Sequence, residues 1–135
     1  MKIALAVNKI CKDINNNLKT IKKMIEKANE HNYDLILFPE AAMTGLINND
    51  NPEHDLPLGE LIPGNITNQL GEIAIKNSIN IVIGMLEREE KKLYDTAIFI
   101  TSDGKVPLKY RRISSGWHGA KTDPNIYCHG KDVPV

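Results

Sequence analysis

Three short apolar runs, separated by two amphipathic patterns of helical period, limit the folds that this chain can adopt. Residues 2–8, 35–38 and 79–86 are apolar almost throughout, which is typical of strands buried on both faces of a sheet. Between the runs, apolar residues recur at spacings of three and four, which predicts two helices. The two stripes are Leu18, Ile21, Ile25 and Ala28, and Ile66, Leu70, Ile73 and Ala74. We therefore expect an α/β fold with both helices on one face of one sheet.

The remaining segments predict a hairpin, a long loop and a tail. Residues 96–101 and 106–113 form an expected antiparallel pair around an Asp-Gly turn at residues 102–105, so the sheet should be mixed. We expect residues 87–92 to form a charged turn before it and residues 15–17, all Asn, to cap the first helix. Residues 41–63 are predicted as a loop, and residues 114–135 as an ordered loop or arm. A loop as long as the first one is often functional.

Composition excludes several classes of protein. A length of 135 residues with 41% hydrophobic side chains suits one domain over residues 1–135 with its own core. The 17 basic and 17 acidic residues balance, so we expect no broad surface for nucleic acid and none for an anionic membrane. The longest apolar runs are too short for a membrane span or a secretion signal, and we expect a cytoplasmic protein.

The sequence also limits which disulfides, metal ions and cofactors we expect. Cys11 and Cys128 are far apart and form no Cys-x-x-Cys pair, so two free thiols are expected and a disulfide framework is not. The His, Cys, Asp and Glu residues have no metal-ligand spacing, and no phosphate-binding glycine loop is present in the sequence. We therefore expect neither a metal nor an organic cofactor.

Glu40 is the first candidate for a catalytic residue. It follows the apolar run 35–38 and Pro39, which ends a strand because it cannot donate to the sheet. Functional groups in α/β proteins collect at the carboxyl ends of strands. Spacing alone leaves open that Glu40 is an exposed carboxylate at a strand end.

The sequence motifs around Glu40 resemble those of a known family. Asp-Leu-Ile-Leu-Phe-Pro-Glu-Ala-Ala-Met-Thr-Gly at residues 34–45 resembles the first signature of the nitrilase, or carbon-nitrogen hydrolase, superfamily. The order of later words is also similar: Ile-Val-Ile-Gly at 81–84, Leu-Tyr-Asp-Thr-Ala at 93–97, Asp-Gly-Lys at 103–105 and Lys-Tyr-Arg-Arg at 109–112. The resemblance covers nearly the whole chain.

This resemblance implies the N-terminal half of an α-β-β-α sandwich and a hydrolase of the amidase or nitrilase type. Its substrate would be a small non-peptide amide or nitrile, attacked by a cysteine within a Glu-Lys-Cys triad that needs no cofactor. Glu40 then looks like the general base, and Arg112 stands at the position of the lysine that stabilises the oxyanion. Tyr110, Trp117 and Thr44 are the expected substrate-binding residues.

The chain departs from the family pattern at two of the three catalytic positions. Arg112 keeps the charge of the lysine but differs in shape and hydrogen-bonding geometry, and it remains open that Arg112 is a surface or interface cation. Lys109 is a poor substitute, because strand alternation places it with Arg111 on the other face. Nothing matches the family's Gly-x-x-Ile-Cys segment, and Cys128 falls in a turn before that segment would begin. We therefore expect this chain alone to be inactive.

A second function from a different class follows from the same strands. Near-continuous apolar strands require cover on both faces, and two helices cover one. The alternative is a catalytically silent module that pairs with itself or with a partner subunit through the open face of the sheet.

The absence of acidic residues between Lys105 and Lys121 also suggests a basic patch around Trp117 for an anionic substrate group, or an ordinary basic hairpin.

Overall fold

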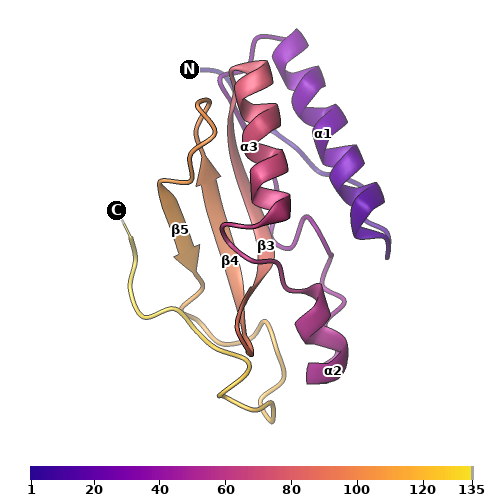
Figure 1. The fold of residues 1–135 in the computed structure, drawn as a ribbon, viewed down its shortest axis with the longest axis vertical. Coiled ribbons are helices and arrows are strands. Elements are labelled where there is room, and N and C mark those ends of the chain that lie inside the picture. Colours follow the sequence, from indigo (N-terminus) through magenta and orange to yellow (C-terminus); the bar gives the residue numbers. More distant parts are fainter. Residues whose placement is uncertain (135) are drawn as a thin grey trace.

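The apolar runs form the parallel half of a five-stranded mixed sheet. The computed structural model describes residues 1–134, and its strands are β1 (Ile3–Leu5), β2 (Leu35–Leu37), β3 (Asn80–Glu89), β4 (Lys92–Ile100) and β5 (Leu108–Arg111). They lie side by side in the order β1-β2-β3-β4-β5, of which Figure 1 shows β3, β4 and β5. The pairs β1–β2 and β2–β3 are parallel, whereas β3–β4 and β4–β5 are antiparallel. The expected mixed sheet is confirmed.

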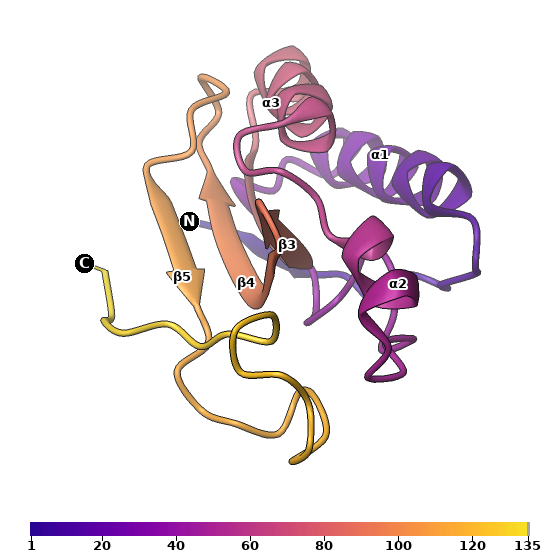
Figure 2. The ribbon, with the colours of Figure 1, turned by 60° about the horizontal axis from the view of Figure 1, so that its bottom comes forward.

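Two long helices cover one face of this sheet, as the apolar spacing predicts. The helices α1 (Ile14–Glu30) and α3 (Asn65–Asn77) pack side by side over the sheet, as Figure 2 shows. Ile21, Ile25 and Leu70 are completely buried against strand residues such as Ile83 and Ile98. Burying a side chain of this size contributes about 1.5–3 kcal/mol, so this layer is the main core of the fold.

The start of α1 differs from the expectation. Asp13, not the Asn cluster, is the N-cap, and its carboxylate accepts hydrogen bonds from the backbone N–H groups of Asn15 and Asn16. Asn17 lies one turn further and is buried, with its amide donating to the carbonyl groups of Cys11 and Met43. The prediction was wrong because a carboxylate two residues earlier satisfies the free N–H groups, and Asn17 serves a tertiary contact instead.

The segment 41–63 is not wholly a loop. It contains a short helix, α2 (Pro52–Asp55), which continues into a 3-10 turn (Leu56–Leu58). Asn51 caps this helix through its side chain, and Pro52 occupies the first helical position. Proline is favoured there because its missing N–H would have no partner in the helix.

The predicted charged turn at residues 87–92 was also wrong. β3 continues to Glu89 and β4 begins at Lys92, so the reversal is confined to Glu90 and Lys91. Glu87 lies inside the strand with its side chain buried. Its negative charge is tolerated there because basic side chains from β5 compensate it, and local charge pattern does not reveal partners that lie 22 or more residues away.

Within residues 1–134, no helix covers the second face of the sheet. The side chains of Ile3, Leu5, Val7 and Leu37 are exposed there at the β1–β2 end, with Leu5 79% and Val7 84% exposed. Ile3, Leu5 and Leu37 belong to β1 and β2, whose opposite face packs on α1 and α3, and Val7 follows β1. We call this surface, defined by the four residues just named, the open face.

The chain after β5 forms an arm along the end of the β3–β4 hairpin (Figure 2). Trp117 and Tyr127 are buried there with Leu86 and Leu93 in a second, smaller core. Tyr127 also forms an isolated parallel bridge with Leu93. The predicted arm is therefore ordered by packing.

Among the helices of residues 1–134, none has the length and apolar character required to cross a membrane.

Candidate active site

Glu40 is held against β3 by backbone contacts on both sides. The N–H of Gly84 donates to the carbonyl of Pro39 at 3.2 Å, and the N–H of Ala42 donates to the carbonyl of Gly84 at 2.9 Å. A Cβ atom at Gly84 would lie 2.7 Å from the Cα of Glu40 and 2.8 Å from the oxygen of Pro39. The glycine therefore allows the turn that carries Glu40 to approach β3 closely.

Arg112, at the end of β5, contacts Glu40, which follows β2. Arg112 directly follows β5, and its backbone N–H donates to the carbonyl of Asp95 at 2.8 Å. Its Nη1 donates to Oε1 of Glu40 at 2.8 Å and to Oδ2 of Asp95 at 3.2 Å, while its Nε donates to the hydroxyl of Ser114. The structure thus brings together the two residues that the sequence singles out as base and cation.

Asp95 is a site residue that the sequence analysis missed. It lies in β4 with its side chain 13% exposed, between Glu40 and Arg112. Burial, and then the facing Glu40 carboxylate, raise the pKa of Asp95 from 3.8 to about 6, against the opposing effect of Arg112. The available signal was strand alternation: once residues 92–100 are one strand, Asp95 and Ala97 share a face with their β5 neighbour Tyr110.

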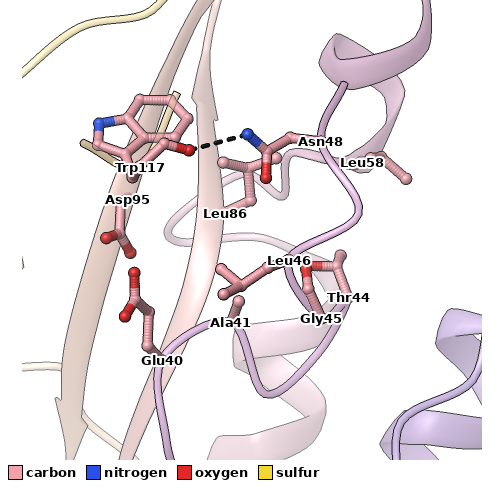
Figure 3. Close-up of a pocket in the computed structure, with 10 residues that line it drawn as sticks. All are labelled: Glu40, Ala41, Thr44, Gly45, Leu46, Asn48, Leu58, Leu86, Asp95 and Trp117. Atoms are coloured by element: carbon pink, nitrogen blue, oxygen red, sulfur yellow. Dashed lines mark hydrogen bonds between the residues drawn. The ribbon is translucent and has the colours of Figure 1, made fainter. Parts of the chain in front are cut away.

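Two hollows meet at the Glu40–Asp95 pair. One is a cavity of about 20 Å³, lined by Thr44 and Trp117 together with both carboxylates (Figure 3), which is room for about one water molecule. The other is open and larger, about 400 Å³, and it is lined by Tyr110 and Arg112 together with the same two carboxylates. The three residues predicted to bind substrate therefore border these hollows, Thr44 and Trp117 on one side and Tyr110 on the other.

The predicted basic patch does not form as one surface. Lys109 and Arg111 point to the opposite face of β5, where both bind the buried carboxylate of Glu87 at 2.6 and 2.7 Å. Arg111 also lies over the ring of Tyr94, with its Cζ 3.8 Å from the ring centroid. Burial alone would raise the pKa of Glu87, but hydrogen bonds from Arg111, Lys109 and Thr96 outweigh it and lower that pKa. These two cations are already paired with Glu87, so they do not join Trp117 in one binding surface.

The two cysteines lie away from the Glu40–Arg112 contact. Cys11 is exposed before α1, and its Sγ lies 3.5 Å from the carbonyl of Asp13. Cys128 sits in the arm with its Sγ 3.5 Å from the carbonyl of Pro124, and neither thiol lines the two hollows. Of the side chains in residues 1–134, no three of the His, Cys, Asp and Glu type gather closely enough to bind a metal ion.

The arrangement combines a proton acceptor with a fixed cation beside an open hollow. The Glu40 side chain is 46% exposed and accessible to a molecule in that hollow, whereas Arg112 is 31% exposed. The hydrogen bond and charge of Asp95 raise the pKa of Arg112, so its guanidinium remains charged at any working pH. Such a pair can accept or return a proton at one point and stabilise negative charge beside it.

Comparison with known proteins gives a consistent family. The model of the family described as carbon-nitrogen hydrolase matches residues 2–120. A probable nitrilase of Schizosaccharomyces pombe is 29% identical over 133 residues, covering 94% of this chain and 46% of that protein. Nitrilase 3 of Arabidopsis thaliana is 27% identical over 111 residues, covering 71% of this chain and 32% of that protein. The chain thus spans less than half the length of these relatives.

Solved structures agree on the fold. A carbon-nitrogen hydrolase from Helicobacter pylori G27 superposes with a TM-score of 0.81 at 15% identity, covering 96% of this chain and 45% of that one. A variant of the amidase from Nesterenkonia sp. AN1, described as carrying acrylamide added to its active site cysteine, gives 0.78 at 20% identity and covers 100% of this chain and 52% of that one. On the match over residues 2–120, this chain belongs to the carbon-nitrogen hydrolase family.

Proposed function

We propose that this chain supplies the general base and the oxyanion-stabilising cation of a carbon-nitrogen hydrolase that cleaves a small non-peptide amide or nitrile. The observation that carries the proposal is the 2.8 Å contact between Glu40 and Arg112 at an open hollow. The two side chains are 72 positions apart in the sequence. The resemblance of residues 34–45 and 109–112 to the family implies a catalytic position for each.

Each role has a physical basis in the proposed reaction. A cysteine thiol with an ordinary pKa near 8.5 is mostly protonated at neutral pH, so it needs a base such as Glu40 to accept its proton. Attack of the thiolate on an amide carbon places negative charge on the carbonyl oxygen, which Arg112 stabilises. A fixed donor at that point lowers the barrier to this step by about 3–4 kcal/mol. Glu40 then returns its proton to the departing amine, and water releases the acyl group.

The nucleophile of this reaction lies outside residues 1–135. Cys128 lies next to Tyr94, whose pKa its thiol helps to raise, after burial as the largest cause. Tyr94 and Asp95 are neighbours in β4 and point to opposite faces, so Cys128 is on the other side of the sheet from Glu40. Cys11 lies at the start of α1. The similar Nesterenkonia amidase has an active site cysteine, which supports a cysteine as the nucleophile here.

The side chains that border the two hollows are proposed to hold the substrate. Tyr110 offers a half-buried ring and a hydroxyl in the larger hollow, which has the size of a small-molecule site. Trp117 and Thr44 close the smaller cavity on the other side of Glu40. Thr44 is buried and its hydroxyl donates to the carbonyl of Gly45, so its role is to shape the wall.

The test compares the 135-residue chain with the full product of its gene. Each is incubated with small amides, nitriles and an activated ester, and intact mass reports any acyl adduct. We expect an adduct and turnover with a longer product that contains the missing cysteine, loss of both in its Glu40→Gln variant, and neither with residues 1–135. An adduct on the short chain that disappears in Cys128→Ser would contradict the assignment of the nucleophile.

The open face favours a second candidate function. Leu5 and Val7 are among the most exposed large apolar residues of the described chain; Leu5 ends β1 and Val7 follows it. A module that pairs with itself or a partner subunit through this face, without catalysis of its own, accounts for that exposure. A full gene product that associates through the open face but forms no adduct with any substrate would favour this candidate.

A further inference from the structure

We propose that Asp95 is the positioning residue of Glu40: the two carboxyl groups share one proton, and Arg112 holds them together at the edge of the larger hollow. The inference deepens the proposed function, because it rests on that function for the role of Glu40 as the base. The sharing of the proton itself stands on the geometry of residues 1–134 and is testable without any catalytic activity.

One nitrogen atom joins the three side chains. Nη1 of Arg112 lies 2.8 Å from Oε1 of Glu40 and 3.2 Å from Oδ2 of Asp95, so both carboxyl groups converge on the same donor. Figure 3 shows these carboxyl groups pointing toward one another from the turn after β2 and from β4. Side chains brought this close on one cation face each other across a short gap, where two negative charges repel.

The charge of the group favours a bound proton. Two ionised carboxylates and one guanidinium carry a net charge of −1, and a single added proton makes the cluster neutral. Asp95 is 13% exposed and Glu40 is 46% exposed, so the proton is better placed on the drier Asp95. Burial and the Glu40 carboxylate together raise the pKa of Asp95 to about 6, although Arg112 acts to lower it.

Few other groups on neighbouring elements can neutralise Asp95. On β3, the residue opposite Asp95 is the apolar Leu86. Arg88, further along β3, lies near Glu60: its backbone N–H donates to the Glu60 carbonyl, and its charge acts to lower the pKa of Glu60. From β5, the phenol of Tyr110 lines the same hollow, and from the arm the facing residue is Trp117. The cations Lys109 and Arg111 point to the opposite face, toward Glu87. In the described chain, Arg112 is therefore the cation that Asp95 and Glu40 share.

A protonated Asp95 positions Glu40 through a hydrogen bond. Its O–H group donates to the Glu40 carboxylate, which fixes the orientation of that carboxylate and leaves its other oxygen free toward the hollow. Asparagine is the matched substitute, because its amide N–H also donates but does not titrate. Alanine removes both the donor and the titration, so the two variants separate orientation from proton sharing.

The first experiment measures the proton directly in the 135-residue chain. Carboxyl carbons are followed by NMR in ¹³C-labelled protein as pH is varied. We expect the Asp95 carboxyl carbon to show a midpoint near pH 6, and the Glu40 carboxyl resonance to respond to the same transition because the two groups converge on one donor. In Asp95→Asn, the Glu40 resonance should lose that response, whereas the control Asp103→Asn, in the exposed turn after β4, should retain it. A Glu40 resonance that does not respond to the Asp95 transition in the wild-type protein overturns the proposal, even if a variant fails to fold.

The second experiment measures the consequence in an active full-length product. Asp95→Asn should shift the acid limb of the kcat/KM profile while keeping most of kcat, and Asp95→Ala should lower kcat about 10- to 100-fold with little change in KM. An acid limb that is unchanged in Asp95→Asn overturns the proposal. A full-length product without hydrolase activity contradicts the proposed function alone, because the response of Glu40 in the first experiment is independent of it.

Discussion

The hydroxyl of Tyr127 donates a hydrogen bond of 2.7 Å to the carboxylate of Asp55, and both side chains are buried. Asp55 also accepts from the backbone N–H groups of Asn49 and Asp50 and contacts the ring of His54. Burial would raise the pKa of Asp55, but the hydrogen bonds from His54, Tyr127 and Asn49 outweigh it and lower that pKa. The arm is thereby tied to the short helix α2.

Removal of this hydroxyl should destabilise the fold. In Tyr127→Phe we expect the free energy of unfolding to fall by about 1–3 kcal/mol, because a buried carboxylate loses one donor. Urea denaturation at pH 7 measures the change. Tyr33→Phe is the matched control, since Tyr33 is half-buried and its hydroxyl makes no hydrogen bond within residues 1–134. Equal effects of the two substitutions would contradict the anchoring role of Tyr127.

The pH dependence of stability should change in the same variant. A carboxyl whose pKa is lowered by folding stabilises the protein above the unfolded value of 3.8, and this contribution is lost as pH falls through the folded value. Tyr127→Phe should therefore make the acid side of the stability profile less steep. Thermal unfolding between pH 2 and pH 6 tests this, and an unchanged slope would exclude Asp55 as the responsible group.

Asp95 should have the opposite dependence. Its raised pKa means that the folded protein keeps a proton that the unfolded chain loses near pH 4, so the stability of the wild type falls as pH rises from about 4 through 6. Asp95→Asn avoids this loss and should gain up to about 3 kcal/mol relative to wild type between pH 4 and pH 8. Denaturation at these two pH values measures it. A constant difference between the two proteins would argue against a raised pKa.

Gly84 should be sensitive to a single added methyl group. In Gly84→Ala the new Cβ meets the backbone of Pro39 and Glu40 at under 3 Å, so we expect a loss of about 1–3 kcal/mol and a displaced turn. The carboxyl resonance of Glu40 reports the displacement. Ala97→Ser, which adds one atom at the paired position of β4, is the control and should leave that resonance nearly unchanged.

Glu87 should contribute more to stability than its neighbour Glu89. Both bind Arg111, but the Glu87 side chain is 2% exposed and Glu89 is 53% exposed. Glu87→Gln leaves Lys109 and Arg111 without their buried partner and should cost about 2–4 kcal/mol, whereas Glu89→Gln should cost less than about 1 kcal/mol. Comparable losses in urea denaturation would show that the buried carboxylate has no special role.

How far the sequence predicts this structure depends on how local each signal is. Strand β2, the turn with Glu40, and the stripes of α1 and α3 follow from periodicity and Pro39, which are local. Asp13 was missed as a cap because a nearby asparagine cluster has similar propensity, and α2 was missed although Asn51 before Pro52 is a local start signal.

The missed parts of the site depend on pairing between distant strands. Glu87 was assigned to a turn because its partners Lys109 and Arg111 lie on another strand. Asp95 was overlooked because β4 was expected to begin at residue 96. With Asp95 outside the strand, alternation could not assign its side chain to either face of the sheet. Glu40 and Arg112 were found because their neighbouring words resemble the family, whereas their contact depends on the register of the whole sheet.

One short strand serves both faces of the sheet. In the segment 108–112, Lys109 and Arg111 neutralise the buried Glu87, while Tyr110 and Arg112 line the hollow beside Glu40. An insertion or deletion of a single residue within β5 would exchange these two sets and leave a buried carboxylate without its cations. A change of two residues would preserve both. Natural length variants of this strand should therefore differ by even numbers of residues, so that the parity of β5 is under stronger selection than its length.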